Sequence, residues 1–356
     1  MNDIKKVIIL GAGASKSDGA PLQRDLFKDF FDYVYKNSRN NILLGEQEKI
    51  LVDFFKTFWN IDIQGHDADE FPTFEDCLGI LDIAYARGES FRGYRKEKIN
   101  QTRDALIFLI GKVLDIRLKG KTNNNHLNLV KRLKKEDKLL QTSFISLNYD
   151  LIIDNVLGDL YNKNEERLYL DYGINFANNE WKEPVPGRSI PLFKIHGSLN
   201  WLQCPTCNQM EYTYSRKDRS YNSVHENAPC RGCQTPMEPV IIPPTFYKNL
   251  NNRFIQEIFL KSEEVLRDAD EVFICGYSFP DADIFMRYVL KRAELFNQKS
   301  PKLYIINRNP ERNPESKEKS YKNNKINRIF KNKANINFTD LSFQEFCEDG
   351  CDDSLN

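Results

Sequence analysis

Four cysteines stand in two pairs whose spacing suits a metal ion. Cys204 and Cys207 form one C-x2-C pair, and Cys230 and Cys233 form the other. Each short turn can present two thiolates to one ion, and two such turns complete a tetrahedral four-sulfur site of the kind that zinc occupies. A redox dithiol is the alternative for a single pair, but two pairs at this spacing disfavour it. Four thiolates leave no open coordination position, so we predict a structural zinc.

A glycine-rich turn follows the first apolar run of the chain. Val7–Leu10 predicts a buried strand, and Gly11-Ala12-Gly13-Ala14-Ser15 comes directly after it. Glycine lets backbone N–H groups approach a phosphate closely. The third glycine of the dinucleotide fingerprint is missing, so an ordinary strand-to-helix turn fits equally well. Gly19–Pro21 marks a second sharp turn, consistent with a loop that folds over a ligand.

His196 and Asn148 each stand where a predicted strand ends. His196 follows Pro191–Ile195, and Asn148 follows the strand that starts at Thr142. The carboxyl ends of parallel strands line the ligand crevice of an open sheet. Local sequence also allows a structural histidine and a helix-capping asparagine. Asp150 equally suits the first turn of a helix, where the dipole favours an acid. His66 and His126 have polar surroundings and are interpreted as incidental.

The elements that must position these residues alternate between strands and helices. Further strands are predicted at Val240–Ile242, Glu271–Cys275, Lys302–Ile306 and Ile336–Phe338, with helices at Asn252–Arg267 and Asp281–Phe296. This alternation predicts an α/β fold with a parallel sheet covered by helices on both faces. Pro21 to Lys138 shows only helical periodicity, with a helix start at Thr73.

Composition limits the classes of partner. Lys and Arg together number 51, as do Asp and Glu, so the zero net charge gives no general reason to bind nucleic acid or anionic membrane. The basic stretch Asn307–Lys333 is interpreted as a solvated surface. No apolar stretch approaches the roughly 18 residues of a membrane span, and Met1–Lys6 does not open a signal peptide. We therefore expect a cytoplasmic protein without membrane contact.

In their chain order, these segments resemble the sirtuin family. The resemblance is carried by Gly11–Ser15 with Gly19–Pro21, Ser146–Asp150, Ile195–Ser198, the two cysteine pairs, Gly276–Phe279 and Ile305–Asn307. It spans most of the sheet-forming chain and leaves out Leu22–Lys138. It implies a Rossmann-type NAD-binding domain of residues 1–21, 139–197 and 239–350. A helical insertion at 22–138 and a zinc ribbon at 198–238 complete the predicted organisation.

The resemblance also implies a role for each matching residue. Asn148 and Asp150 would orient the nicotinamide ribose, its carboxamide and a water, and His196 would be the general base acting on a ribose hydroxyl. The remaining cofactor-binding residues would hold the phosphates (Gly11, Ala12, Gly13 and Ser15), would contact the adenosine half (Gly276, Ser278 and Asn307) or would lie in the covering loop (Pro21).

Cleavage of NAD between ribose and nicotinamide suits such a site. The ribose becomes oxocarbenium-like while the nicotinamide leaves as a neutral molecule. The enzyme mainly has to hold the ribose, exclude stray water and place a nucleophile. A neutral histidine suits proton removal near physiological pH, and the step needs no metal ion.

Departures from the family's deacylases favour hydrolysis. Those deacylases carry Asp-Phe-Arg after the Gly-x-Pro turn, where this chain has Leu22–Phe27. Their peptide-binding segment, typically Phe-Gly-Glu, is replaced by Pro239–Thr245, whose prolines interrupt an edge that would pair with a peptide. Gly276–Asp283 resembles the prokaryotic branch linked to phage defence, which hydrolyses NAD to ADP-ribose and nicotinamide.

The sequence therefore predicts an NAD hydrolase that depletes NAD in bacterial anti-phage defence. An NAD-dependent protein lysine deacylase is the alternative, and a sensor that binds NAD or ADP-ribose without turnover is a third possibility. The resemblance further implies a homo-oligomer and an activating partner such as a HerA-type ATPase or an Argonaute.

Overall fold

The computed structural model describes residues 4–39, 44–62, 70–120, 122, 124–163, 168–178, 184–185, 187–213, 228–242, 252–281, 283–296, 301–307 and 326–351. His66, residues 243–245 of the proline-bearing segment and residues 308–325 of the basic stretch lie outside these ranges. The interpretations given to them stay predictions.

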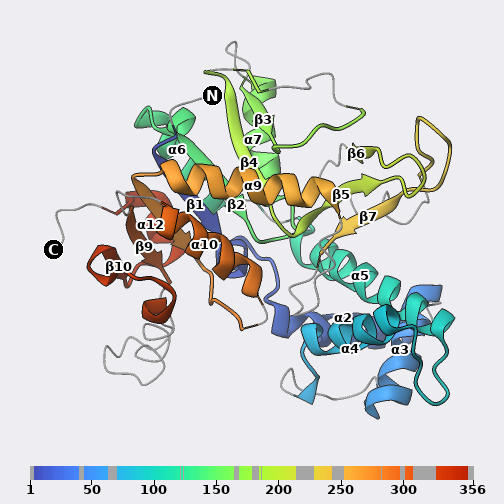
Figure 1. The fold of residues 1–356 in the computed structure, drawn as a ribbon. Coiled ribbons are helices and arrows are strands. Elements are labelled where there is room, and N and C mark those ends of the chain that lie inside the picture. Colours follow the sequence, from blue (N-terminus) through green and yellow to red (C-terminus); the bar gives the residue numbers. More distant parts are fainter. Residues whose placement is uncertain are drawn as a thin grey trace.

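A parallel sheet forms the centre of the described part of the chain (Figure 1). It has seven strands within the described residues, in the order β10-β9-β8-β1-β2-β4-β3, and neighbouring strands pair in parallel. The strands are β1 (Lys6–Leu10), β2 (Thr142–Ser146), β3 (Tyr169–Asp171), β4 (Ser189–Lys194), β8 (Glu271–Cys275), β9 (Lys302–Ile306) and β10 (Ile336–Thr339). Val7 to Leu10 are almost completely buried, as expected for a parallel strand covered on both faces.

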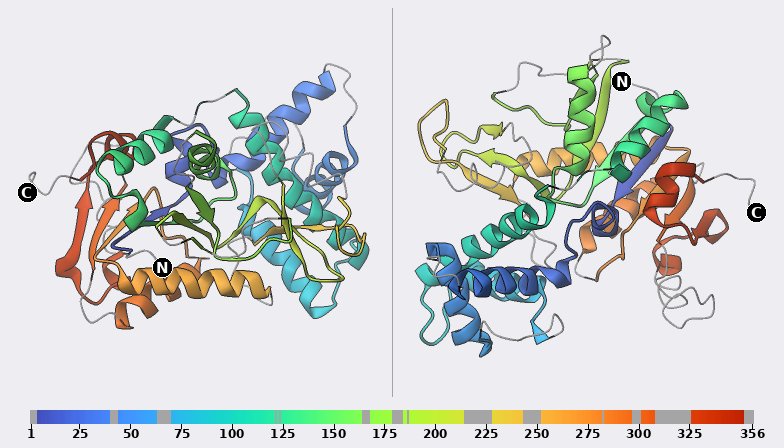
Figure 2. Two further views of the ribbon diagram at one scale, coloured as in Figure 1. Left: turned by 90° about the horizontal axis from the view of Figure 1, so that it is seen from above. Right: turned by 180° about the vertical axis from the view of Figure 1, so that it is seen from behind.

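Helices cover both faces of this sheet, which confirms the predicted Rossmann-type α/β fold. The helices are α1 (Ala12–Lys16), α6 (Asn124–Lys135), α7 (Ile152–Lys163), α9 (Arg253–Asp268), α10 (Ile284–Phe296) and α12 (Phe343–Asp349). Figure 2 shows α6, α7 and α12 on one face and α9 and α10 on the other. Short 3₁₀ helices connect some elements: η1 (Gln23–Asp25), η3 (Leu139–Gln141) and η4 (Lys333–Asn335).

The central strand β1 has β2 on one side and β8 on the other. The chain therefore extends the sheet away from β1 in two directions. In open α/β sheets, the loops at the carboxyl ends of the strands separate at such a point and leave a crevice for ligands. The residues after β1, β2, β4 and β8 are the ones that meet there.

Four helices form a lobe beside the sheet, α2 (Leu26–Arg39), α3 (Glu46–Trp59), α4 (Phe74–Arg87) and α5 (Lys96–Leu118) (Figure 1). The core of this lobe is rich in phenylalanine. The rings of Phe31 and Phe71 stack with centroids 5.3 Å apart, and Phe27 meets Phe55 edge to face at 4.7 Å. Thr73 caps α4 by accepting a hydrogen bond from Asp76 N, which confirms the predicted helix start.

Helix α6 packs differently from these four helices. Its buried residues Leu129, Val130 and Leu133 belong to the core of the large sheet, and α6 packs against α7 and α12. We therefore propose that the helical insertion, predicted at 22–138, ends after α5. The other predicted domain boundaries stay predictions.

A second, antiparallel sheet carries the cysteine pairs. Its order is β6-β5-β7, with β5 (Gly197–Gln203), β6 (Met210–Tyr212) and β7 (Glu238–Ile241). The strand predicted at Val240–Ile242 forms as β7, but it joins this small sheet because it pairs with β5. Within the described ranges, no helix has the length and apolar character needed to cross a bilayer.

Candidate functional site

A cavity of about 170 Å³ lies where the loops of the large sheet meet the helical lobe. Its walls come from the segments that follow β1, β2, β4 and β8, and from α2, α4 and α5 of the lobe. Eight of the predicted site residues line it: Ala12, Ser15, Pro21, Asn148, Asp150, His196, Gly276 and Ser278. The sheet thus brings together residues that are more than 250 positions apart in the chain, as Ala12 and Ser278 show.

Three of the eleven predicted catalytic and cofactor-binding residues are not among the residues that line this cavity. Asn307 is exposed directly after β9. The N–H groups of Gly11 and Gly13 donate to Cys275 O and Gly276 O at 2.9 and 2.8 Å. These two amide groups are therefore already occupied by the loop after β8.

Close packing explains why glycine, and no larger residue, fits at positions 11 and 13. A Cβ on Gly11 would lie 2.6 Å from Gly276 O, and one on Gly13 would lie 2.8 Å from Gly276 Cα. Backbone cannot yield at such distances, so any side chain would push the two loops apart. Gly276 itself has a φ of +61°, which favours glycine. The phosphate role predicted for Gly11 and Gly13 stays a prediction.

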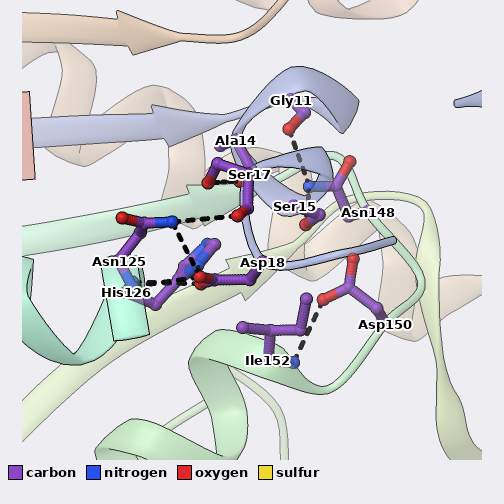
Figure 3. A network of polar contacts seen from close by, with 10 residues as sticks. All are labelled: Gly11, Ala14, Ser15, Ser17, Asp18, Asn125, His126, Asn148, Asp150 and Ile152. Carbon is purple, nitrogen blue, oxygen red and sulfur yellow. Dashed lines mark hydrogen bonds and ion pairs between the residues drawn. The ribbon is translucent and has the colours of Figure 1, made fainter. Parts of the chain in front are cut away.

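Asn148 joins the loops after β1 and β2. Its Nδ2 donates to Gly11 O at 2.9 Å and to Ser15 Oγ at 2.8 Å (Figure 3). The local alternative, in which Asn148 caps the next helix, does not match these contacts. Asp150 lies at the helix start instead, where its Oδ1 accepts a hydrogen bond from Ile152 N at 3.0 Å. Asn148 is therefore held against the glycine turn by both of its amide contacts.

His196 is buried, with 3% of its surface exposed. Its Nδ1 lies 3.1 Å from Leu147 O, and its Nε2 lies 3.5 Å from Asp283 Oδ1. A carbonyl oxygen only accepts hydrogen bonds, so Nδ1 carries a hydrogen and Nε2 is the nitrogen on the Asp283 side. This orientation leaves Nε2 as the ring atom that can take up a proton.

Asp283 lines the cavity, and no role is predicted for it from the sequence. Its Oδ2 accepts a hydrogen bond from Tyr277 OH at 2.8 Å. Burial, reinforced by the charge of Asp283, raises the pKa of Tyr277 well above its ordinary value, so this hydroxyl stays a donor. In the sequence, Asp283 is marked only by its place directly before an apolar helix. A helix-capping role explains that position equally well.

A buried network fixes the far end of the loop after β1 (Figure 3). Asp18 Oδ2 lies 2.5 Å from His126 Nδ1, and Asp18 Oδ1 accepts hydrogen bonds from Asn125 N and Nδ2. Burial alone would raise the pKa of Asp18, but the hydrogen bonds from His126 and Asn125 and the charge of His126 outweigh it and lower the pKa. His126, which has polar neighbours in sequence, is thus an internal anchor, with 1% of its surface exposed.

The four paired cysteines come together, away from this cavity. Their sulfur atoms all lie within 4.8 Å of one another, with Cys204 Sγ 3.4 Å from Cys233 Sγ and Cys207 Sγ 3.5 Å from Cys230 Sγ. A tetrahedral zinc ion with Zn–S bonds of about 2.3 Å needs sulfur separations of about 3.8 Å. The four cysteines are therefore positioned to bind one metal ion, and the donor set suits zinc.

Comparisons with solved structures give weak likenesses over nearly the whole chain. A Sir2 mutant with a p53 peptide and NAD is 13% identical with a TM-score of 0.44, covering 97% of this chain and 91% of that one. A Sir2 homolog–NAD complex is 14% identical with a TM-score of 0.44, covering 97% and 86%. Because these TM-scores lie below 0.5, they support no statement on ligand or reaction.

Among curated proteins, none matches the chain. A family model described as "SIR2-like domain" matches residues 142–329, which is more than half of the 356 residues. The matched range contains Asn148, His196, the four paired cysteines and Asp283. The chain therefore belongs to the SIR2-like domain family.

Proposed function

We propose that the protein is an NAD hydrolase, which converts NAD to ADP-ribose and nicotinamide. The observation that carries the proposal is the meeting of Asn148 and His196 on one cavity, from the adjacent strands β2 and β4. The same cavity is lined by Ala12 and Ser15 of the glycine turn. An amide, an imidazole and a nucleotide-type turn at the carboxyl ends of parallel strands suit a dinucleotide.

Each group has a chemical task in this proposal. Ala12 and Ser15 hold the phosphates, while Asn148 and Asp150 position the ribose that carries nicotinamide. Holding the ribose in place supplies much of the acceleration, because the bond to nicotinamide breaks by dissociation and the leaving group is neutral. In place of the ribose hydroxyl that the family resemblance implies, His196 here takes the proton from the water that attacks the ribose. Leu147 O holds Nδ1, so Nε2 is the ring nitrogen that can accept this proton.

The strand next to the site favours hydrolysis over deacylation. A deacylase has to offer a free strand edge to its peptide. Here Ile242 N donates to His196 O at 2.9 Å, and Ile242 O accepts from Tyr149 OH at 3.1 Å. Both backbone groups of Ile242 are therefore engaged internally, and Pro239 in β7 has no N–H to offer.

Product analysis tests this proposal. Purified protein is incubated with NAD, with and without an acyl-lysine peptide, and nicotinamide and ADP-ribose are quantified. We expect both products in equal amounts without the peptide, and none from the His196→Ala variant. Strict dependence on the peptide would establish the deacylase instead. Binding of NAD without product would establish a sensor.

The remaining parts of the proposal have separate support. Zinc at the four cysteines is supported by the sulfur separations and would stabilise the small sheet rather than take part in the reaction. NAD depletion in anti-phage defence, a homo-oligomer, and a HerA-type ATPase or Argonaute partner are supported only by the resemblance stated for Gly276–Asp283 and its neighbouring motifs.

A further inference from the structure

A buried carboxylate faces the histidine of the proposed site. Asp283 Oδ1 lies 3.5 Å from His196 Nε2, and the two side chains are 1% and 3% exposed. They come from separate parts of the fold: His196 follows β4, and Asp283 directly precedes α10. Both line the same cavity.

Hydrogen-bond donors reach both oxygens of Asp283. Tyr277 OH donates to Oδ2 at 2.8 Å, and Met286 N in the first turn of α10 donates to Oδ1 at 3.4 Å. The start of a helix stabilises a negative charge. Because a carboxylate that receives donors on both oxygens is held in place, Asp283 presents Oδ1 to His196 in a fixed direction.

The other face of His196 is equally defined. Nδ1 already carries a hydrogen, which it donates to Leu147 O. Any further proton on the ring therefore has to bind at Nε2, the nitrogen that faces Asp283. A proton captured there converts the ring to an imidazolium in a buried position. A charged ring in such surroundings is strongly unfavourable unless an opposite charge stands beside it.

We propose that Asp283 is the positioning residue of His196, which fixes the ring and stabilises the imidazolium that forms when His196 takes a proton from the attacking water. This rests on the proposed function. In the step, the water oxygen bonds to the ribose C1′ and the bond from C1′ to the nicotinamide nitrogen breaks, with its electron pair staying on nicotinamide. The water proton goes to Nε2, and Asp283 itself takes no proton.

Other ionisable groups face this pair from neighbouring elements. Burial raises the pKa of Glu75 in α4, and Tyr149 and Tyr277 are buried phenols whose pKa values are raised by burial and by nearby carboxylates. Arg287 of α10 is directed elsewhere, because it bonds to Phe279 O, Pro280 O and Asp281. Among these neighbouring groups, Asp283 is the carboxylate that contacts the imidazole of His196, at 3.5 Å.

The pairing is tested without turnover by nitrogen–proton NMR on protein with labelled histidine, with His196→Gln to assign the signal. Once the ring carries a proton on Nε2, we expect an Nε2–H signal of His196 that is protected from solvent exchange. Asp283→Asn should lower that protection by about tenfold or more, the range of a lost charge-assisted hydrogen bond. Asp281→Asn is the matched control, an exposed carboxylate two residues away, and should keep the protection.

Kinetics then test the consequence for the reaction. Asp283→Asn should lower kcat by about 100-fold with little change in KM, because general-base assistance contributes this much and substrate contacts remain. Tyr277→Phe removes the hydrogen bond to one oxygen of Asp283. Its kcat should therefore lie between those of wild type and Asp283→Asn. An unchanged exchange signal, or equal kcat in Asp283→Asn and Asp281→Asn, would overturn the inference. If the protein does not cleave NAD, the proposed function fails, while the NMR result still decides the pairing.

Discussion

Asn148 Nδ2 lies 2.8 Å from Ser15 Oγ, so a side chain from the second strand's loop holds the glycine turn of the first. The same nitrogen donates to Gly11 O. This contact joins the proposed phosphate-binding turn to the proposed ribose-binding residue. It makes the geometry of the site depend on one amide.

Asn148→Ala should therefore affect both reaction and stability. The loss of two hydrogen bonds should lower the free energy of unfolding by about 1–3 kcal/mol. Nicotinamide release should fall by about 100-fold or more, because the ribose loses its positioning group. Denaturant unfolding and product assays measure the two effects. Wild-type NAD consumption by this variant would remove Asn148 from the proposed site.

The close approach of the loops after β1 and β8 makes a second prediction. Gly13→Ala should lower the free energy of unfolding by about 1–3 kcal/mol, since its Cβ meets the Gly276 backbone at 2.8 Å. Gly79→Ala is the matched control: no atom lies within 4 Å of its Cβ, and the site is inside α4. That control should gain about 0.5–1 kcal/mol. Equal effects of the two substitutions would refute the packing argument.

The buried pair of Asp18 and His126 makes the fold sensitive to acid. The folded-state pKa of Asp18 lies below its ordinary value of about 3.9, so its stabilising contribution is present above that value. The contribution is lost as the pH falls through the lower, folded-state pKa. Asp18→Asn should therefore lower stability at neutral pH and flatten its decline in acid, as measured by thermal unfolding across pH.

A half-exposed carboxylate provides the comparison for Asp18. Asp53 pairs with Lys98 and keeps 54% of its side chain exposed, so Asp53→Asn should change stability by no more than about 0.5–1 kcal/mol. Asp18→Asn should lower the free energy of unfolding by clearly more than this, because it alters a buried pair. If the stability of Asp18→Asn and Asp53→Asn depends on pH in the same way, the stabilising role of the Asp18–His126 pair is wrong.

The cysteine cluster predicts one bound metal ion per chain. Cys207→Ser should release the ion and reduce solubility before it alters the reaction, because metal binding contributes folding free energy. Metal content by mass spectrometry and the soluble fraction are the measurements. Cys351→Ser, outside the cluster, should retain the ion. A soluble, metal-free and fully active Cys207→Ser protein would contradict the structural role.

The strands were predictable where their hydrophobic runs are continuous, as at Val7–Leu10 and Glu271–Cys275. β3 was missed because its three residues are only half-buried at the sheet edge and carry no such run. The chain positions of Asn148 and His196 were readable because both follow strands. Their partners were not, since contacts such as His196 to Asp283 join residues far apart in the chain.

Tertiary contacts also explain the other differences. His126 is surrounded by polar residues in sequence, and its burial comes from Asp18, which lies 108 residues earlier. The helix that carries His126 follows the lobe in the chain but packs on the sheet. The sequence predicts a phosphate-binding reason for glycine at positions 11 and 13, which stays a prediction. The packing reason, the close approach of the Gly276 backbone, appears only in the fold.

A crystal structure of the His196→Ala variant soaked with NAD tests the central claim most directly. The account predicts an intact dinucleotide in the cavity, with the nicotinamide ribose beside Asn148 and the vacated position of His196. Density for NAD elsewhere on the protein, or a ribose turned away from both residues, would contradict it.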